Sequence, residues 1–250
     1  MESMRGLVGA ASVAAVLWAV GGGQPVNAAS LLSITGASDL PVPANNDLVP
    51  TPNAAFEGLV PLGGVIDDLD ASGLFWSAGT QVSTTANNVT LSYNYIGSLA
   101  AATNVFSTSG GSFTTPGLSE SAGGDSTPQA SFSVSQALAG LVDFSFSSGS
   151  GGASVGNVTG NNAAGSGAIT FSVSYLELQE APGGGVLWEI TDTPTNFVLL
   201  LLDDSGAGPD ADYDDLGVVL VATPIPAALP LLATALVGLG LLGWRRRYSR

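Results

Sequence analysis

The clearest strand pattern in this sequence is Asn88-Val89-Thr90-Leu91-Ser92-Tyr93-Asn94-Tyr95. Its apolar residues occupy every second position, so Val89, Leu91, Tyr93 and Tyr95 share one face of an extended chain. Successive side chains of a β-strand point to opposite faces of the sheet. The stretch therefore predicts a strand that buries one face and leaves polar residues on the other.

The same period of two, or a short apolar run, recurs further along the chain. The other strands expected on this basis are Phe132–Val134, Val142–Phe146, Ile169–Tyr175, Val186–Ile190, Phe197–Leu202 and Leu216–Val221. Phe197–Leu202 is apolar at every position, which predicts a central strand buried on both faces. The Gly-, Ser- and Asn-rich connector 147–167 is expected to form no element of its own, and a helical turn or two is expected near 135–140.

About seven short strands without a long amphipathic helix predict an all-β fold. The expected architecture is an antiparallel β-sandwich, with the jelly roll as one arrangement of it. Residues 29–73 are rich in Pro, Asn, Ala and Leu without sustained periodicity, and we expect loops there with one or two short strands. The predicted organisation is one acidic β-domain at 29–222, flanked by separate segments at 1–28 and 223–250.

The charge of the predicted domain is purely negative. The chain has five basic residues, all of them arginine, and none lies between Ala29 and Thr223, whereas every one of the 20 acidic residues except Glu2 does. His and Cys are absent from the chain. This composition makes nucleic acid or an anionic lipid surface an unsuitable partner and cations the expected counter-charge. It also excludes a disulfide framework and a zinc site of the usual Cys/His kind.

The N-terminus has the pattern of a secretory signal. Leu7–Val20 is an apolar run that follows Arg5, and Val26-Asn27-Ala28 fits the rule of small residues before a cleavage site. We expect cleavage between Ala28 and Ala29, with an uncleaved membrane anchor as the alternative.

The densest acidic cluster lies between the last two predicted strands. Gly206, Gly208 and Pro209 favour a turn there, so the carboxylates face one another across a hairpin connection. Because the segment has no cationic side chain, a hard cation with oxygen ligands, Ca²⁺, is one expectation, and a hydrated acidic hairpin is the other. The candidate Ca²⁺ ligands are Asp203, Asp204, Asp210, Asp212, Asp214 and Asp215. Their spacing does not match an EF-hand, because Asp215 and Val221 occupy the positions of its turn Gly and its final Glu.

The residues that catalysis would need are scarce. The predicted domain has no His base and no Cys or Lys nucleophile. Glu177, Glu180 and Glu189 are the carboxylates from which a glycosidase pair could come, but we expect them to be exposed strand residues without a catalytic role. Trp76 and Trp188 are the aromatic residues that a carbohydrate-binding module would stack on sugars. We therefore predict a protein that is not an enzyme and has no cofactor other than Ca²⁺.

Residues 223–250 combine spaced prolines, an apolar segment and a basic end. Leu229–Trp244 carries no charge and would form a helix about 24 Å long, slightly shorter than a hydrocarbon core of about 30 Å. Arg245, Arg246 and Arg247 follow it, and the positive-inside rule keeps them in the cytoplasm. With a cleaved signal peptide, the acidic domain then lies on the far side of the membrane.

This tail resembles a PEP-CTERM protein-sorting signal. The resemblance rests on Pro224, Pro226, Ala227, Ala228, Leu229 and Pro230, on the Gly- and Leu-rich helix after them, and on Arg245, Arg246 and Arg247. Ile225 replaces the Glu of the motif's name, as in a Pro-x-Pro-Ala-Ala-Leu-Pro variant. Residues 88–98, 103–106 and 210–216 are similar to segments of the proteins that carry such signals.

The resemblance implies an exopolysaccharide-producing Gram-negative bacterium and an exosortase, a membrane protease that processes the tail. The expected partners are therefore exosortase and the membrane during sorting, and then matrix polysaccharide. The expected location is a membrane-anchored precursor followed by the cell surface or extracellular matrix. The expected role is structural or adhesive. A carbohydrate-binding module and a periplasmic domain held permanently by one helix are the alternatives.

Overall fold

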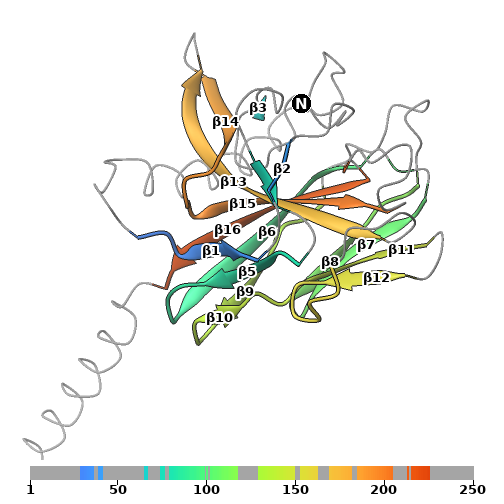
Figure 1. The fold of residues 1–250 in the computed structure, drawn as a ribbon, viewed down its shortest axis with the longest axis horizontal. Coiled ribbons are helices and arrows are strands. Elements are labelled where there is room, and N and C mark those ends of the chain that lie inside the picture. Colours follow the sequence, from blue (N-terminus) through green and yellow to red (C-terminus); the bar gives the residue numbers. More distant parts are fainter. Residues whose placement is uncertain are drawn as a thin grey trace, which may run out of the picture.

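A computed structural model of the 250-residue chain describes residues 29–36, 39–41, 65–66, 74–76, 79–98, 100, 102–117, 129–149, 153–162, 169–181, 185–204, 213 and 215–225. Every regular element in this part is a β-strand (Figure 1), which confirms the all-β prediction for it. The described part of the chain holds no helix capable of crossing a membrane. The helices predicted for the signal peptide and the tail lie outside the described residues.

The described residues form sixteen strands in three sheets, and every pair is antiparallel except β3 with β14. The large sheet has the order β2 (Asp39–Pro41), β4 (Leu74–Trp76), β13 (Thr170–Ala181), β15 (Phe197–Asp203), β16 (Leu216–Pro224), β6 (Val89–Gly97) and β9 (Phe132–Gln136). In the same sheet, β14 (Gly185–Thr191) pairs with β13 and with β3 (Val65–Ile66). The four-stranded sheet has the order β12 (Ser154–Gly156), β11 (Ser145–Ser148), β7 (Asn104–Thr108) and β8 (Gly111–Thr114). The three-stranded sheet has the order β1 (Leu32–Thr35), β5 (Gln81–Thr84) and β10 (Gly140–Leu141).

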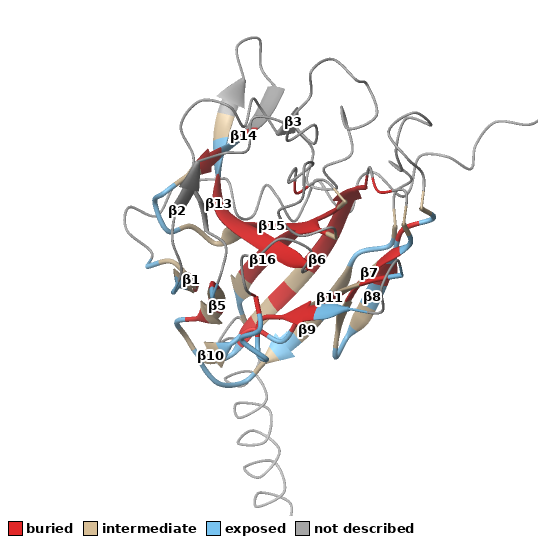
Figure 2. Ribbon diagram, turned by 45° about the vertical axis from the view of Figure 1, so that its right-hand side comes forward, coloured by how far each residue is buried: buried red, intermediate tan, exposed pale blue. Residues whose placement is uncertain are grey.

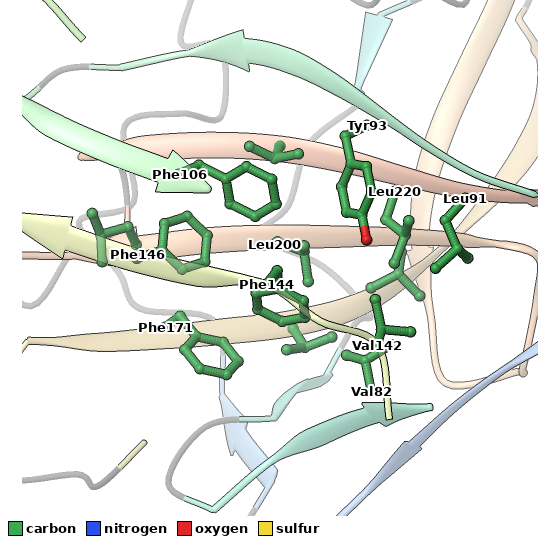
Figure 3. Close-up of a cluster of buried hydrophobic side chains, with 14 of the residues drawn as sticks. Val82, Leu91, Tyr93, Phe106, Val142, Phe144, Phe146, Phe171, Leu200 and Leu220 are labelled. Carbon is green, nitrogen blue, oxygen red and sulfur yellow. The ribbon is translucent and has the colours of Figure 1, made fainter. Parts of the chain in front are cut away.

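The two smaller sheets pack against one face of the large sheet, which gives the molecule a sandwich-like core (Figure 2). Val89, Leu91, Tyr93 and Tyr95 of β6 all point into this core and are almost fully buried, as their alternation predicts. Aromatic rings from both layers fill much of it (Figure 3). Their centroid distances run from 4.8 Å, between Phe113 and Phe132, to 6.1 Å, between Phe144 and Phe146. Such pairs stabilise the core beyond their apolar burial.

The opposite face of the large sheet is apolar as well. β15 lies between β13 and β16, and its residues alternate between the two faces. Val198, Leu200 and Leu202 belong to the central core, whereas Leu199 and Leu201 belong to a second cluster with Trp188 and Tyr213. The prediction that Phe197–Leu202 forms a central strand buried on both faces is confirmed.

Two local predictions are wrong. The helical turn expected near 135–140 is absent, because β9 continues to Gln136 and β10 begins at Gly140. The Gln136 side chain holds this corner by donating from Nε2 to the carbonyls of Leu138 and Gly140, both at 3.1 Å. The connector 147–167 contains the end of β11 and all of β12, because Val155 finds a buried place in the central core.

The strand expected at Val142–Phe146 begins only at Ser145, yet Val142, Phe144 and Phe146 are all buried. The strands β5, β7, β8 and β10 were not anticipated, because their segments alternate too weakly in hydrophobicity.

Candidate functional site

The acidic connection, defined here as residues 203–215, joins β15 to β16. The register places Leu202 opposite Leu216, and the Asp215 N–H donates to the Leu202 carbonyl at 3.1 Å. The chain therefore leaves and re-enters the large sheet at one place. Of the six candidate Ca²⁺ ligands, Asp203, Asp204 and Asp215 are described, while Asp210, Asp212 and Asp214 lie outside the described residues.

Neutral donors hold the carboxylates at the two ends of this connection. The Asp204 backbone N–H donates to Asp215 Oδ2 at 2.6 Å, and Asn104 Nδ2 donates to Asp204 Oδ2 at 2.8 Å. Ser98 Oγ donates to the Asp215 carbonyl at 2.6 Å. A hydrogen bond to a carboxylate is stronger than one between neutral groups, so the bonds to Asp204 Oδ2 and Asp215 Oδ2 relieve part of the repulsion between the acidic side chains. The Ser98 bond holds the backbone of the connection.

Sequence reasoning did not assign Asn104 or Ser98 to this site. Asn104 begins β7 and Ser98 follows β6, so both lie far from the acidic connection in the sequence. Asn104 is fully buried, and its Oδ1 has no hydrogen-bond partner. No spacing or motif in the sequence links either residue to the acidic connection.

Buried side chains anchor the same connection to both faces of the large sheet. Tyr213 is buried in the outer cluster with a left-handed backbone (φ 52°), and Leu216 is buried in the central core. Thr170 Oγ1 lies 3.4 Å from the Tyr213 hydroxyl. Asp203 is fully buried at the end of β15. The connection is therefore held by packing as well as by hydrogen bonds.

In the described part of the chain, no three acidic side chains come together in a group that could hold a metal ion. Of the described candidates, Asp204 and Asp215 are joined by a hydrogen bond, and three of the six candidate ligands are not described. Calcium binding stays a prediction.

The carboxylates considered for glycoside hydrolysis lie on the hairpin of β13 and β14. Glu177 and Glu189 are directly opposite each other in the register, and both are exposed. The side chain of Glu180 lies outside the described residues. Directly opposed like charges destabilise a strand pair, so this arrangement favours a hydrated surface for the hairpin.

Trp188 does not present a ring for sugar stacking. It is 1% exposed and packs edge-on against Phe197, with ring centroids 4.8 Å apart. Its Nε1 has no hydrogen-bond partner. Trp188 is a core aromatic residue, so the sugar-stacking alternative does not hold for it, because the outer apolar cluster covers its ring. The side chain of Trp76 lies outside the described residues.

The chain contains one Gly-x-Ser-x-Gly pattern, the sequence motif of many serine hydrolases. Gly152-Ala153-Ser154-Val155-Gly156 has the residue types of a serine-hydrolase nucleophile elbow, which places its Ser on a turn from a strand into a helix. Here Ser154 lies in β12, and a turn at 157–160 follows. The Ser154 carbonyl accepts a hydrogen bond from Asn161. Since the chain has no His to serve as base, the match is a chance one.

A groove of about 410 Å³ lies beside β9, where the edge of the large sheet meets the smaller sheets. Leu91, Val134, Leu138 and Leu141 line its apolar part, and Tyr93 and Asp143 contribute polar groups. Burial raises the pKa of the Tyr93 phenol, and the Asp143 carboxylate raises it further. Tyr93 is therefore a protonated hydroxyl group at neutral pH.

The remaining predicted positions lie at the ends of the described domain. Ala29 is exposed, and Ala28 lies outside the described residues. Pro224 is exposed at the end of β16. The other sorting-signal residues, Pro226 to Pro230 and Arg245 to Arg247, lie outside the described residues.

Comparison of the chain with protein-family models, with curated proteins and with solved structures finds no match.

Proposed function

We propose that this chain is exported and sorted to the cell surface or extracellular matrix, where its β-domain serves as a structural or adhesive component. The observation that carries the proposal is the position of the tail. The last strand of the large sheet, β16, ends at Pro224, the first proline of the sorting motif. The sorting motif thus begins in the last residues of the sheet, where Pro224 pairs with Val89 and the Ile225 N–H donates to the Asn88 carbonyl. In this proposal the membrane protease acts on the segment that follows.

In this proposal the signal peptide directs export and is cleaved between Ala28 and Ala29. The apolar helix then holds the precursor in the membrane, with Arg245, Arg246 and Arg247 on the cytoplasmic side. Exosortase recognises the motif from Pro224 to Pro230 and releases the domain. The domain leaves behind the basic residues of the tail, so the released protein is wholly anionic.

The anionic domain suits a matrix in which divalent cations bridge acidic polymers. Calcium bound by the acidic connection would stabilise the domain in that setting, and a jelly-roll arrangement of the sandwich is the finer fold assignment that belongs to this proposal. No enzymatic step forms part of it.

The mass of the mature protein tests the sorting step. Intact mass spectrometry of the protein recovered from the extracellular and envelope fractions should show a chain that begins at Ala29 and has lost the arginine cluster. The double variant Pro226→Ala, Pro230→Ala should accumulate as a longer, membrane-bound precursor. Pro116→Ala, at an exposed loop position of the described domain, is the matched control and should be processed normally.

A full-length tail on a permanently membrane-bound protein would contradict the proposal and favour the periplasmic domain held by one helix. For the carbohydrate-binding alternative, the residue still to be tested is Trp76. Loss of binding to matrix polysaccharide in Trp76→Ala, with binding retained in Phe197→Leu, would favour that alternative.

A further inference from the structure

β9 is an edge strand whose outer side is unpaired within the described residues, since it pairs with β6 alone. On the other side of β6, the Ile225 N–H donates to the Asn88 carbonyl, so Thr90 and Ser92 bond to β16 and Leu91 is left to bond to β9. Antiparallel strands alternate between bonded and non-bonded pairs. Val134 therefore directs its N–H and C=O toward β6, and Ser133 and Ser135, which are exposed, direct theirs away from the sheet.

Other sheet edges of the molecule are closed by carboxamide side chains. On β8, Gln129 accepts from the Thr114 N–H at 3.2 Å and donates to its carbonyl at 3.0 Å. On β12, Asn161 accepts from the Gly156 N–H and donates to the Ser154 carbonyl, both at 2.9 Å. Each side chain thus takes the place of a neighbouring strand. No side-chain amide of the described residues does this for Ser133 or Ser135, and β9 has neither Pro nor a charged residue to block pairing.

The groove lies directly beside this open edge. Leu138 is 72% exposed and Leu141 is 40% exposed, so an apolar wall stands in solvent next to Val134. The hydrogen bonds from Gln136 to the carbonyls of Leu138 and Gly140 hold that wall in place. Figure 2 shows the exposed residues along β9 and its neighbouring corner. An unpaired strand with a preformed apolar groove beside it is the combination that binds an extended peptide by strand addition.

Two kinds of strand could pair with this edge, one from a second copy of this chain and one from another polypeptide, and their charge distinguishes them. Asp143 is exposed at the groove, and the segment from Ala29 to Thr223 has no basic residue. Two copies of so acidic a domain repel each other, whereas a basic segment is attracted. The second copy of this chain is therefore the weaker occupant.

We propose that the outer edge of β9 binds an extended, basic segment of a partner polypeptide as an added strand. One apolar side chain of that segment enters the groove between Val134 and Leu138, and a Lys or Arg lies against Asp143. This surface is distinct from the sorting tail, and its use does not depend on where the chain is sorted.

The experiment measures binding of a synthetic heptapeptide in which Val alternates with Lys and Thr, with both ends blocked. Full-length protein in an uncharged detergent is titrated with the labelled peptide at low and physiological salt. Saturable binding is expected, and it should weaken as salt rises. A copy of the peptide with one N-methylated amide on the edge that pairs with β9 should bind about tenfold more weakly, because it loses a main-chain hydrogen bond.

Three protein variants locate the site. Asp143→Asn should weaken binding about two- to fivefold and reduce its salt dependence. Leu138→Ser should weaken binding as well, and since Leu138 is mostly exposed, the fold should tolerate the change. Glu189→Gln is the matched charge control and should bind as wild type does, because β14 lies on the far side of β13, β15, β16 and β6 from β9.

Equal binding of the N-methylated and unmodified peptides would overturn the proposal, and so would equal weakening by Asp143→Asn and Glu189→Gln. Absence of saturable binding at millimolar peptide would also overturn it. Dimerisation of the protein that Leu138→Ser abolishes, without peptide binding, would assign the edge to a second copy instead.

Discussion

At the scale of single residues, buried carboxamides do the work that salt bridges cannot do in this domain. Asn157 is fully buried and makes three hydrogen bonds to backbone groups. It accepts from the Val82 N–H at 2.7 Å and donates to the carbonyls of Val82 and Val142 at 2.7 and 2.6 Å. One side chain thereby joins β5 to the segment that precedes β11. Asn162 bonds the N–H and C=O of Phe171 in the same manner.

Asn157→Ala is expected to lower the free energy of unfolding by about 2–4 kcal/mol. The variant removes the partner of the Val82 N–H and of the Val142 carbonyl, whereas the Val82 carbonyl still accepts from the Val142 N–H. Each buried group left without a partner costs about 1–3 kcal/mol, partly offset by relaxation. Urea unfolding followed by tryptophan fluorescence measures the change. Val158→Ala, at the exposed neighbouring position, is the control and should change stability by less than about 0.5 kcal/mol. Equal effects of the two substitutions would refute the anchoring role of Asn157.

The buried Tyr93 phenol makes stability fall at high pH. Burial raises its pKa above the ordinary value of about 10, and Asp143 adds to the effect. The unfolded chain therefore releases this proton first, so the stabilisation is fully present below about pH 10 and is lost as pH rises further. The slope due to one such group approaches about 1.4 kcal/mol per pH unit. In Tyr93→Phe, urea midpoints between pH 9 and 11 should decline less steeply than in wild type, and parallel declines would contradict the prediction.

At the scale of elements, the pairing of β6 with β16 contains a one-residue irregularity. It allows two successive residues of β6 to pack on opposite faces of the large sheet. Gly217 pairs with Gly97 and Val218 with Tyr95, so Ile96 is the extra residue of a β-bulge. Ile96 packs in the outer cluster, while Tyr95 remains in the central core. A Cβ atom on Gly217 would lie 2.6 Å from Ile96 Cγ1. The close approach of Ile96 explains why position 217 holds Gly.

Gly217→Ala should therefore destabilise the protein by about 1–3 kcal/mol through overpacking against Ile96. The double variant with Ile96→Ala should lose less than the sum of the two single variants, because the colliding atoms are gone. A double-mutant cycle of urea unfolding measures this coupling, with an expected interaction of at least about 0.5 kcal/mol. Additive losses would show that Ile96 is not what restricts position 217.

At the scale of the whole molecule, the domain carries one sign of charge around a largely apolar interior. Every acidic residue but Glu2 lies between Ala29 and Thr223, where there is no basic residue to pair with it. Hydrogen bonds from backbone, amide and hydroxyl groups offset part of this repulsion locally, as at Asp204 and Asp215. The rest acts against the compact state, because self-repulsion falls when the chain unfolds.

Added salt is therefore expected to stabilise the protein. Raising the ionic strength from about 0.01 M to 0.15 M shortens the Debye length from about 30 Å to 8 Å, and the melting temperature should rise by a few degrees. Differential scanning calorimetry in buffers with sodium chloride measures the change. A melting temperature that falls with salt would contradict dominant repulsion.

Calcium binding at the acidic connection predicts an additional effect at constant ionic strength. Ca²⁺ should raise the melting temperature above the value in sodium chloride alone, and a chelator should reverse the increase. The variant Asp212→Asn, Asp214→Asn should lose that increase, whereas Glu177→Gln, on the hairpin of β13 and β14, should keep it. Isothermal titration without heat and without a melting shift would refute a calcium site.

The sequence by itself determined the strands whose apolar residues alternate, the two-sided burial of β15 and the single sign of the domain's charge, because period and charge are local properties. It also contains the tail that resembles a sorting signal. Only the tertiary structure decided which distant residues meet. Asn157 bonds Val82 across 75 positions and Ser98 bonds Asp215 across 117, and neither contact is visible until strand order and register are set. The same holds for β12, a polar segment that forms a strand because it pairs with β11 and buries Val155 in the central core. It holds equally for the edge position of β9, because the order of the strands in the sheet determines which strand lies at its edge.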